Sequence, residues 1–241
     1  MTKTEMMALL KAKRNEAGIR KWKRDSQSGG LKSYGIGLTV LRKLARQIGR
    51  DHALAMKLWK SDNYDARVIA LLIDDPKLIT REQVENLGYG YLAHVFSSCD
   101  ATLAKAPFVV EFAGDWINSD DSMHRRCGYG LLYEVSKSKK KSAPDDAFFL
   151  AWIDHIRKSF SSEVRSVNRS MGVALMGMGV RNRTLHAAAL KVASMIGPLE
   201  VGSDDSNCKP FDAAGHLTSE ITKRRLGLYQ SDREPRSRGD E

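Results

Sequence analysis

Three short stretches of this 241-residue chain each combine a helix-start signal with one or two arginines. The stretches begin at Ser61, Ser119 and Ser161 and run through acidic or amide residues into small and apolar ones. Ser, Asp and Asn are favoured at a helix N-cap, so each stretch predicts a helix with Arg near its start. A guanidinium presented from such a helix can hold a phosphate through charge-assisted hydrogen bonds. The stretches therefore predict phosphate contacts at several points along the chain.

The spacing of these arginines also indicates an architecture. Arg126 and Arg169 are 43 residues apart, and HEAT and armadillo repeats are roughly 40–47 residues long. Such repeats stack helix pairs into a curved solenoid with an extended concave face. Arg67, Arg126 and Arg169 would then line that face from matching positions. Arg125 and Arg165 lie in the same stretches and join the predicted contact set.

A structural role is the alternative for these arginines. Asp121 and Glu163 are close enough in the sequence to pair with Arg126 or Arg169. We favour phosphate contact, because the repeat places both arginines on comparable helix faces.

The composition points to a polyanionic partner. The chain has 39 Lys plus Arg against 29 Asp plus Glu, a net charge of +10. Neutralising phosphates releases counterions, so this surplus favours nucleic acid. No apolar run reaches the roughly 18 residues of a membrane span, and the first residues lack the order of a secretory signal. We expect a soluble, monomeric cytoplasmic protein associated with the nucleoid.

Cysteine and histidine positions indicate no metal site. Cys99, Cys127 and Cys208 show no CxxC spacing, and the six histidines form no HExxH or comparable pair. We therefore predict neither a disulfide framework nor a bound metal.

The apolar pattern predicts an all-α protein. Val and Ile never alternate with polar residues over the length of a strand, whereas helical spacing recurs throughout. Within 38–48, the basic residues, Arg42 and Lys43 among them, lie opposite the apolar side, which adds these two to the predicted phosphate contacts. The helices are expected at 4–24 (broken near Gly18), 38–48, 51–60, 64–73, after Thr80, and near 90–104, 107–118, 122–136, 145–159, 162–179, 182–196 and 210–224.

Other segments are expected outside helices. Residues 25–37 are rich in Gly and Ser and predict a loop, and the basic stretch 137–142 predicts a solvated linker more readily than a phosphate contact. We expect one helical domain over 1–227, with a basic helical segment at 1–24. A flexible tail is expected at 228–241.

The order of several phrases resembles the AlkD-like DNA alkylation repair family. The phrases span roughly residues 30–216: Tyr34-Gly35-Ile36, Leu41-Arg42-Lys43-Leu44-Ala45, Ala55-Met56-Lys57-Leu58-Trp59, Asp65-Ala66-Arg67, Ile73-Asp74-Asp75-Pro76, Cys99-Asp100, Arg125-Arg126-Cys127-Gly128, Val180-Arg181-Asn182, Cys208-Lys209 and Asp212-Ala213-Ala214. The resemblance implies a HEAT-like solenoid that holds duplex DNA in a basic concave groove. It also implies, for the glycosylase members, cofactor-free excision of N-alkylated purines.

The site residues of those glycosylases carry over in part. The family Asp matches Asp100, one expected Trp is Phe96, and the phosphate-binding Arg matches Arg126. The second Trp matches Val173, which has no π face. A shifted register would bring His94 or Ala93 to the position of the Asp, and Asp100 could also be an ordinary exposed acid.

Two main functions follow. The first is a monofunctional glycosylase, in which Asp100 stabilises the sugar cation that forms as a positively charged base leaves. The second is a non-catalytic protein that recognises bent, damaged or branched DNA, which Phe96 and Val173 favour. A protein-binding scaffold is a third possibility that the net positive charge disfavours.

Overall fold

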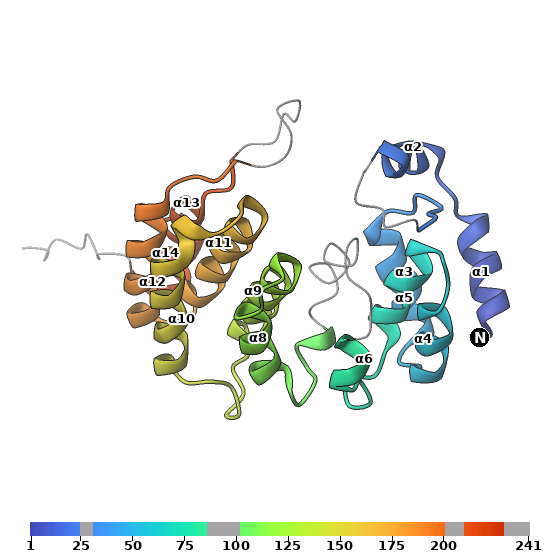
Figure 1. The fold of residues 1–241 in the computed structure, drawn as a ribbon, viewed down its shortest axis with the longest axis horizontal. Helices are drawn as coiled ribbons and strands as arrows, with labels where there is room; N and C mark the ends of the chain where they lie inside the picture. The colour runs from blue at the N-terminus through green and yellow to red at the C-terminus, as the bar shows by residue number, and fades with distance from the viewer. Residues whose placement is uncertain (25–30, 86–101, 201–209, 229–241) are drawn as a thin grey trace, which may run out of the picture.

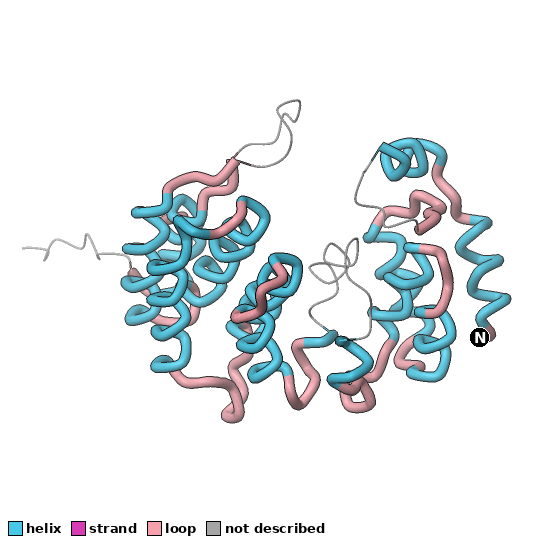
Figure 2. Tube along the Cα trace, in the orientation of Figure 1, coloured by secondary structure: helices cyan, strands magenta, loops and turns pink. Residues whose placement is uncertain are grey.

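The computed structural model describes residues 1–24, 31–85, 102–200 and 210–228. In this part of the chain the helices follow one another along an open arc, from α1 at one end to α14 at the other (Figure 1). Figure 2 shows helices joined by loops, with no strand among the described residues. Two isolated bridges join Lys32 to Asn63 and Leu199 to Phe211. The predicted all-α class is confirmed.

The sequence predicted most helix positions well, because caps and apolar periodicity are local signals. The helices are α1 (Lys3–Ala12), α2 (Glu16–Arg24), α3 (Leu38–Ile48), α4 (His52–Trp59), α5 (Tyr64–Ile73), α6 (Arg81–Glu85), α8 (Val109–Ile117), α9 (Ser122–Ser136), α10 (Asp146–Ser159), the 3-10 turn η1 (Phe160–Ser162), α11 (Arg165–Gly179), α12 (Arg183–Ile196), α13 (Ala213–Leu217) and α14 (Glu220–Leu226).

Two boundaries differ from the prediction for identifiable reasons. The break in the N-terminal segment lies at residues 13–15, and Gly18 is inside α2. The helix expected over 210–224 is two short helices, because the Ser219 hydroxyl accepts from Thr222 N and starts α14 as a new helix. Most of the predicted helix 90–104 and, apart from Leu228, the predicted tail 228–241 lie outside the described residues.

Helix pairs give the arc its layers. α4 packs on α5, α8 on α9, and α11 on α12, while α9 and α11 join consecutive pairs. The core runs through these contacts, and its largest fully buried side chains include Phe112, Tyr129 and Phe149. Burial of one apolar face per helix is what a stacked-repeat architecture requires.

The loop before α3 is fixed by the carboxylate of Asp65, which has no exposed surface. Its Oδ2 accepts from Tyr34 N at 2.6 Å and from the Ser33 hydroxyl at 2.9 Å, and its Oδ1 accepts from Ile36 N at 3.1 Å. Trp22 of α2 closes the other side, because its Nε1 donates to Leu31 O at 2.9 Å. The loop is therefore held between α2 and α5, which sets where α3 begins.

The packing of α2 against this loop requires a glycine at position 18. Asn15 N donates to Tyr34 O at 2.8 Å, which brings the start of α2 against the loop. A Cβ at Gly18 would lie 2.7 Å from Gly35 C and 2.8 Å from Gly35 Cα. These are backbone atoms, and Gly35 itself has φ +69°, a left-handed conformation that glycine adopts without strain.

Gly18→Ala is therefore expected to displace α2 and to cost about 1–3 kcal/mol of unfolding free energy, as overpacking typically does. Ala17→Gly, next to it on the exposed side of α2, is the control for helix propensity, at about 1 kcal/mol. Urea unfolding of both variants measures this. A Gly18→Ala variant as stable as the wild type would show that α2 does not pack on the loop as described.

Candidate nucleic-acid interface

All three of the repeated stretches lead into a helix, and two of the three helices have a capping residue of the type that the pattern indicated. Asn63 accepts from Ala66 N at 3.0 Å and starts α5, and Asp121 accepts from Met123 N at 2.8 Å and starts α9. The third helix, α11, begins after Val164, which has no capping side chain. Counted from these N-caps, Arg126 and Arg169 both stand five residues into their helices. Their predicted equivalence is confirmed at this level.

Arg67 is out of register with this pair, which corrects the expectation of three matching arginines. It stands four residues after its N-cap, the position that Arg125 occupies in α9. From there its Nε reaches back to Ser61 O at 2.9 Å, while Arg125 Nη1 donates to Ser119 O at 2.9 Å. Both arginines thus fasten the start of a helix to the loop before it.

A structural role for Arg125 follows from its remaining contacts. Nη1 also donates to Asp120 O at 2.8 Å, and Nε and Nη2 donate to the Glu163 carboxylate at 2.7 and 3.0 Å. The Glu163 side chain is only 10% exposed, so water screens this bidentate pair less than a surface pair. Glu163 raises the pKa of Arg125. Four of its five N–H groups are therefore committed, which disfavours the predicted phosphate contact.

Arg67 is also partly withdrawn from solvent. Its guanidinium lies over the Trp59 ring, 5.4 Å from the ring centre, and burial lowers its pKa. The arrangement is a cation–π contact, so a structural role accounts for the position of Arg67 as well.

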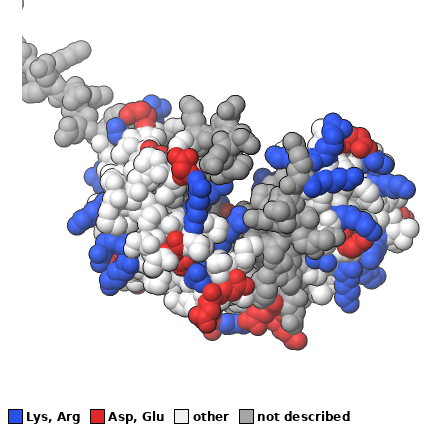
Figure 3. All heavy atoms as spheres, turned by 45° about the horizontal axis from the view of Figure 1, so that its top comes forward, with Lys and Arg blue, Asp and Glu red and all other residues white. Residues whose placement is uncertain are grey.

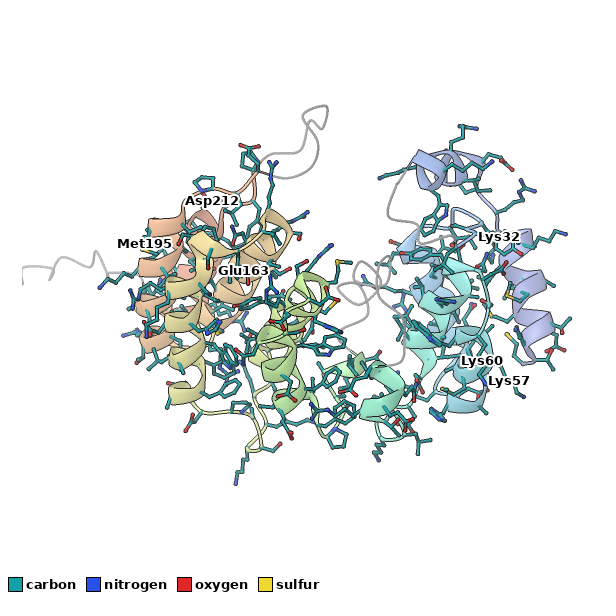
Figure 4. The ribbon with its side chains drawn as sticks, in the orientation of Figure 1. Lys32, Lys57, Lys60, Glu163, Met195 and Asp212 are labelled. Atoms are coloured by element: carbon teal, nitrogen blue, oxygen red, sulfur yellow. The ribbon has the colours of Figure 1, made fainter. Side chains whose placement is uncertain are left out.

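Three other arginines of the predicted contact set remain available for phosphate contact. Arg165 and Arg169 are exposed and Arg126 is half-buried, and no hydrogen bond or ion pair holds their guanidinium groups within the described residues. Glu163, labelled in Figure 4, lies directly before α11 on the side of α9. Because Arg125 binds this acid, Glu163 does not neutralise Arg165 or Arg169 beside it.

Helix α3 carries the second basic group. Arg42 and Lys43 are exposed, and Arg42 shares a cavity of about 480 Å³ with Arg46, Arg50, Ala45, Gly49 and Leu72. Arg50 Nη1 donates to Leu72 O at 3.1 Å and Asp74 O at 2.6 Å, which ties it to the end of α5. The sequence prediction omitted Arg46, although it stands four residues after Arg42 and so lies on the same side of α3. It also omitted Arg50, which lies beyond the end of α3 at Ile48.

The cations are unevenly distributed over the surface. Figure 3, which brings the top of Figure 1 toward the viewer, shows Lys and Arg over the N-terminal part, near the middle and along the left side of the C-terminal part, with acids along the lower edge. Lys57 and Lys60 lie elsewhere, on the outer side of the N-terminal helices (Figure 4).

The predicted catalytic residues cannot be placed in the same way, because Asp100 and Phe96 lie outside the described residues. Val173 is on α11 and half-buried. Its neighbour Gly172 packs against the Phe211 ring, since a Cβ there would lie 2.9 Å from Phe211 Cε1. The Leu199–Phe211 bridge is thereby seated on α11 beside Val173.

The described residues form neither a metal-binding cluster nor a membrane-spanning helix. No group of three or more His, Cys, Asp or Glu side chains could hold a metal ion. No helix in this part of the chain has the length and apolar character needed to cross a membrane.

The fold is shared with a solved structure. That structure is described as a new family of proteins related to the HEAT-like repeat DNA glycosylases, with affinity for branched DNA structures. The TM-score is 0.79 at 20% sequence identity, over 94% of this chain and 97% of the other. The predicted HEAT-like architecture is thus confirmed.

Two curated bacterial proteins are similar in sequence, both described as uncharacterised. The protein from Listeria monocytogenes is 24% identical and the one from Listeria innocua 23% identical, each over 219 residues. The alignments cover 89% of this chain and 93% of each relative.

The model of one protein family, described as DNA alkylation repair enzyme, matches residues 4–197, from α1 to the end of α12. Because this match covers most of the chain, the chain belongs to the DNA alkylation repair enzyme family.

Proposed function

We propose that this protein binds duplex DNA through Arg126, Arg165 and Arg169, with Arg42 and Lys43 of α3 extending the contact. One observation carries this proposal. Arg125 binds Glu163, and so leaves the arginines around the starts of α9 and α11 without an acidic partner among the described residues. Arg126 and Arg169 stand at equal positions of α9 and α11, which pack on each other, and this spacing suits the regularly spaced phosphates of a DNA backbone.

The DNA that fits this site best is distorted or branched. Phosphate contacts position a duplex but carry no sequence information, so selectivity would come from shape and deformability. Val173, aliphatic where the glycosylase resemblance places a Trp, favours recognition without chemistry. The affinity of the structural relative for branched DNA supports the same function.

Excision of alkylated purines is the second candidate, supported by the family and by the Cys99-Asp100 phrase. Alkylation of a purine ring nitrogen makes the base cationic and a better leaving group. Cleavage of the glycosidic bond then builds positive charge on the sugar. A carboxylate fixed beside the sugar, the role proposed for Asp100, would stabilise that charge or orient the attacking water. The reaction calls for no cofactor.

The two candidates are separated by measuring release of methylated purine from alkylated duplex DNA. If the protein is a glycosylase, the wild type releases methylated purine, and Asp100→Asn lowers the rate of release by at least about 10²-fold, the typical effect of removing one stabilising group. DNA binding should be retained in this variant. Recognition without chemistry predicts no release from either protein and tighter binding to a four-way junction than to a linear duplex of equal length. Release that Asp100→Asn leaves unchanged would remove Asp100 from the mechanism.

A further inference from the structure

A cavity of about 690 Å³ lies where α9 and α11 end, against α13 and α14. It is separate from the proposed DNA contacts, which lie near the starts of α9 and α11. No acid is among its described lining residues, whereas four carry a positive charge: Lys137, Lys139, Arg181 and Arg225. Met176 and Ile221 are among the apolar residues of the lining. The volume is that of a site for one small molecule.

Arg181 prepares this cavity for an anion. Helix C-termini carry partial negative charge from free carbonyls, which would repel a phosphate. Arg181 Nη1 donates to Ser136 O and, at 2.8 Å, to Ser138 O, so it satisfies carbonyls at the end of α9. Its guanidinium rests on the Phe149 ring, 4.3 Å from the centre, and its buried Nε has no partner among the described residues.

Two further cations face the cavity without a carboxylate of their own. Lys139 and Arg225 are exposed, and neither forms an ion pair within the part of the chain described. Lys137 differs, since Glu134 binds it at 2.5 Å. The partial negative charge at the end of α9 explains why cations stand at Lys137 and Arg181. It does not explain Lys139, which lies beyond the end of α9.

The lining also has apolar residues and three polar side chains, those of Ser136, Thr222 and Asn182, that are hydrogen-bonded elsewhere. Ile221 is 81% exposed at the cavity, although it is a large apolar residue. The Ser136 hydroxyl donates to Tyr133 O at 2.6 Å, and the Thr222 hydroxyl donates to His216 O at 3.0 Å. The amide of Asn182 is bound by Asp146 at 2.8 and 2.9 Å. These three side chains are therefore not available to distinguish one base from another.

We propose that this cavity binds a single nucleotide, with the phosphate at Lys139, Arg181 and Arg225 and the base against Ile221 and Met176. The nucleotide is either free or the phosphorylated end of a DNA strand, since both present the same chemistry. Affinity depends on the phosphate and little on which base is attached, because the side chains of Ser136, Thr222 and Asn182 are engaged elsewhere.

Calorimetric titration of the full chain with dAMP, dTMP, deoxyadenosine and inorganic phosphate tests the site. We expect dAMP and dTMP to bind with Kd values of about 1 mM or tighter that differ by no more than about threefold. Deoxyadenosine and inorganic phosphate alone should bind at least tenfold more weakly. No binding of nucleotide, or equal binding of phosphate alone, would overturn the proposal.

Variants locate the bound nucleotide. Lys139→Gln with Arg225→Gln is expected to weaken dAMP at least tenfold, and Ile221→Glu to abolish binding, whereas Ile221→Val binds as the wild type does. All three positions are exposed. Equal affinity in the Lys139→Gln, Arg225→Gln double variant and the wild type would refute the site.

A pair of short duplexes, with and without a 5′-phosphate, distinguishes the two sources. If the protein prefers the phosphorylated duplex and the Lys139→Gln, Arg225→Gln double variant loses this preference, the site binds strand ends. If the two duplexes bind equally while dAMP still binds, the site binds free nucleotide. Arg126→Gln with Arg169→Gln is expected to leave dAMP binding unchanged, so the test is independent of the proposed DNA face.

Discussion

Replacing Arg126 and Arg169 together with glutamine is expected to weaken duplex DNA binding by roughly a hundredfold. A hydrogen bond between charged groups contributes about 1.5–3 kcal/mol, so losing two phosphate contacts costs about 3 kcal/mol at the lower limit. The slope of log K against log salt should fall by about 2 at the same time, because each contact releases close to one counterion. Fluorescence anisotropy over a salt series measures both quantities.

Lys57→Gln with Lys60→Gln is the matched control. These lysines are exposed and lie on the outer side of the N-terminal helices (Figure 4). Their replacement removes the same net charge as replacement of the two arginines. We expect less than about threefold weakening, since only the long-range field changes. Equal weakening by the two double variants would mean that net charge, and not the face with Arg126 and Arg169, determines binding.

Arg125→Gln tests whether Arg125 has a structural role or binds phosphate. It should lower the free energy of unfolding by about 3 kcal/mol, because Glu163 is left largely buried without its partner. The salt slope of DNA binding should stay within error of the wild type. A slope lower by about 1 would return Arg125 to the set of phosphate contacts.

Asp65→Ala is expected to lower the free energy of unfolding by about 3–5 kcal/mol. The carboxylate is fully buried and accepts from two backbone N–H groups and one hydroxyl. Its removal leaves the N–H groups of Tyr34 and Ile36 unsatisfied, at about 1–3 kcal/mol each, and opens a cavity. The large effect reflects how tightly this one side chain holds the loop before α3.

Urea unfolding compares this variant with Asp62→Ala, which removes a nearby acid at the surface. Asp62 pairs with Lys32 at 2.9 Å, but its side chain is 67% exposed. Such pairs contribute about 0–1 kcal/mol, so Asp62→Ala should unfold close to the wild type. Similar losses in the two variants would show that the contacts of Asp65 do not hold the loop. Asp65→Asn should lie between them, since one amide oxygen can still accept.

Two of the phrases that carried the family resemblance have a physical explanation in this structure. Tyr34-Gly35-Ile36 and Asp65-Ala66-Arg67 are far apart in the sequence, yet the Asp65 carboxylate joins them. Arg67 fastens the start of α5 to Ser61. These residues were recognisable from the sequence because the fold needs them. Their presence therefore speaks for the architecture and not for catalysis.

What the sequence determined by itself was local. Apolar periodicity and N-cap residues such as Asp51, Asn63 and Asp121 predicted the helices, because a cap bonds to an N–H two or three residues away. The period of 43 residues between Arg126 and Arg169 predicted their equal places in α9 and α11, because equal helix-pair lengths preserve register along a solenoid.

What only the tertiary structure decided was which charges are available. Arg125 and Arg126 are adjacent in the sequence, and nothing local tells them apart. Glu163 stands 38 residues after Arg125 and binds Arg125 alone of the two, because neighbouring residues on a helix point in directions about 100° apart. Gly18 gained its role in the same way, from a backbone contact with Gly35. Pairing and close approach across helices depend on three-dimensional distance, which residue type and spacing do not encode.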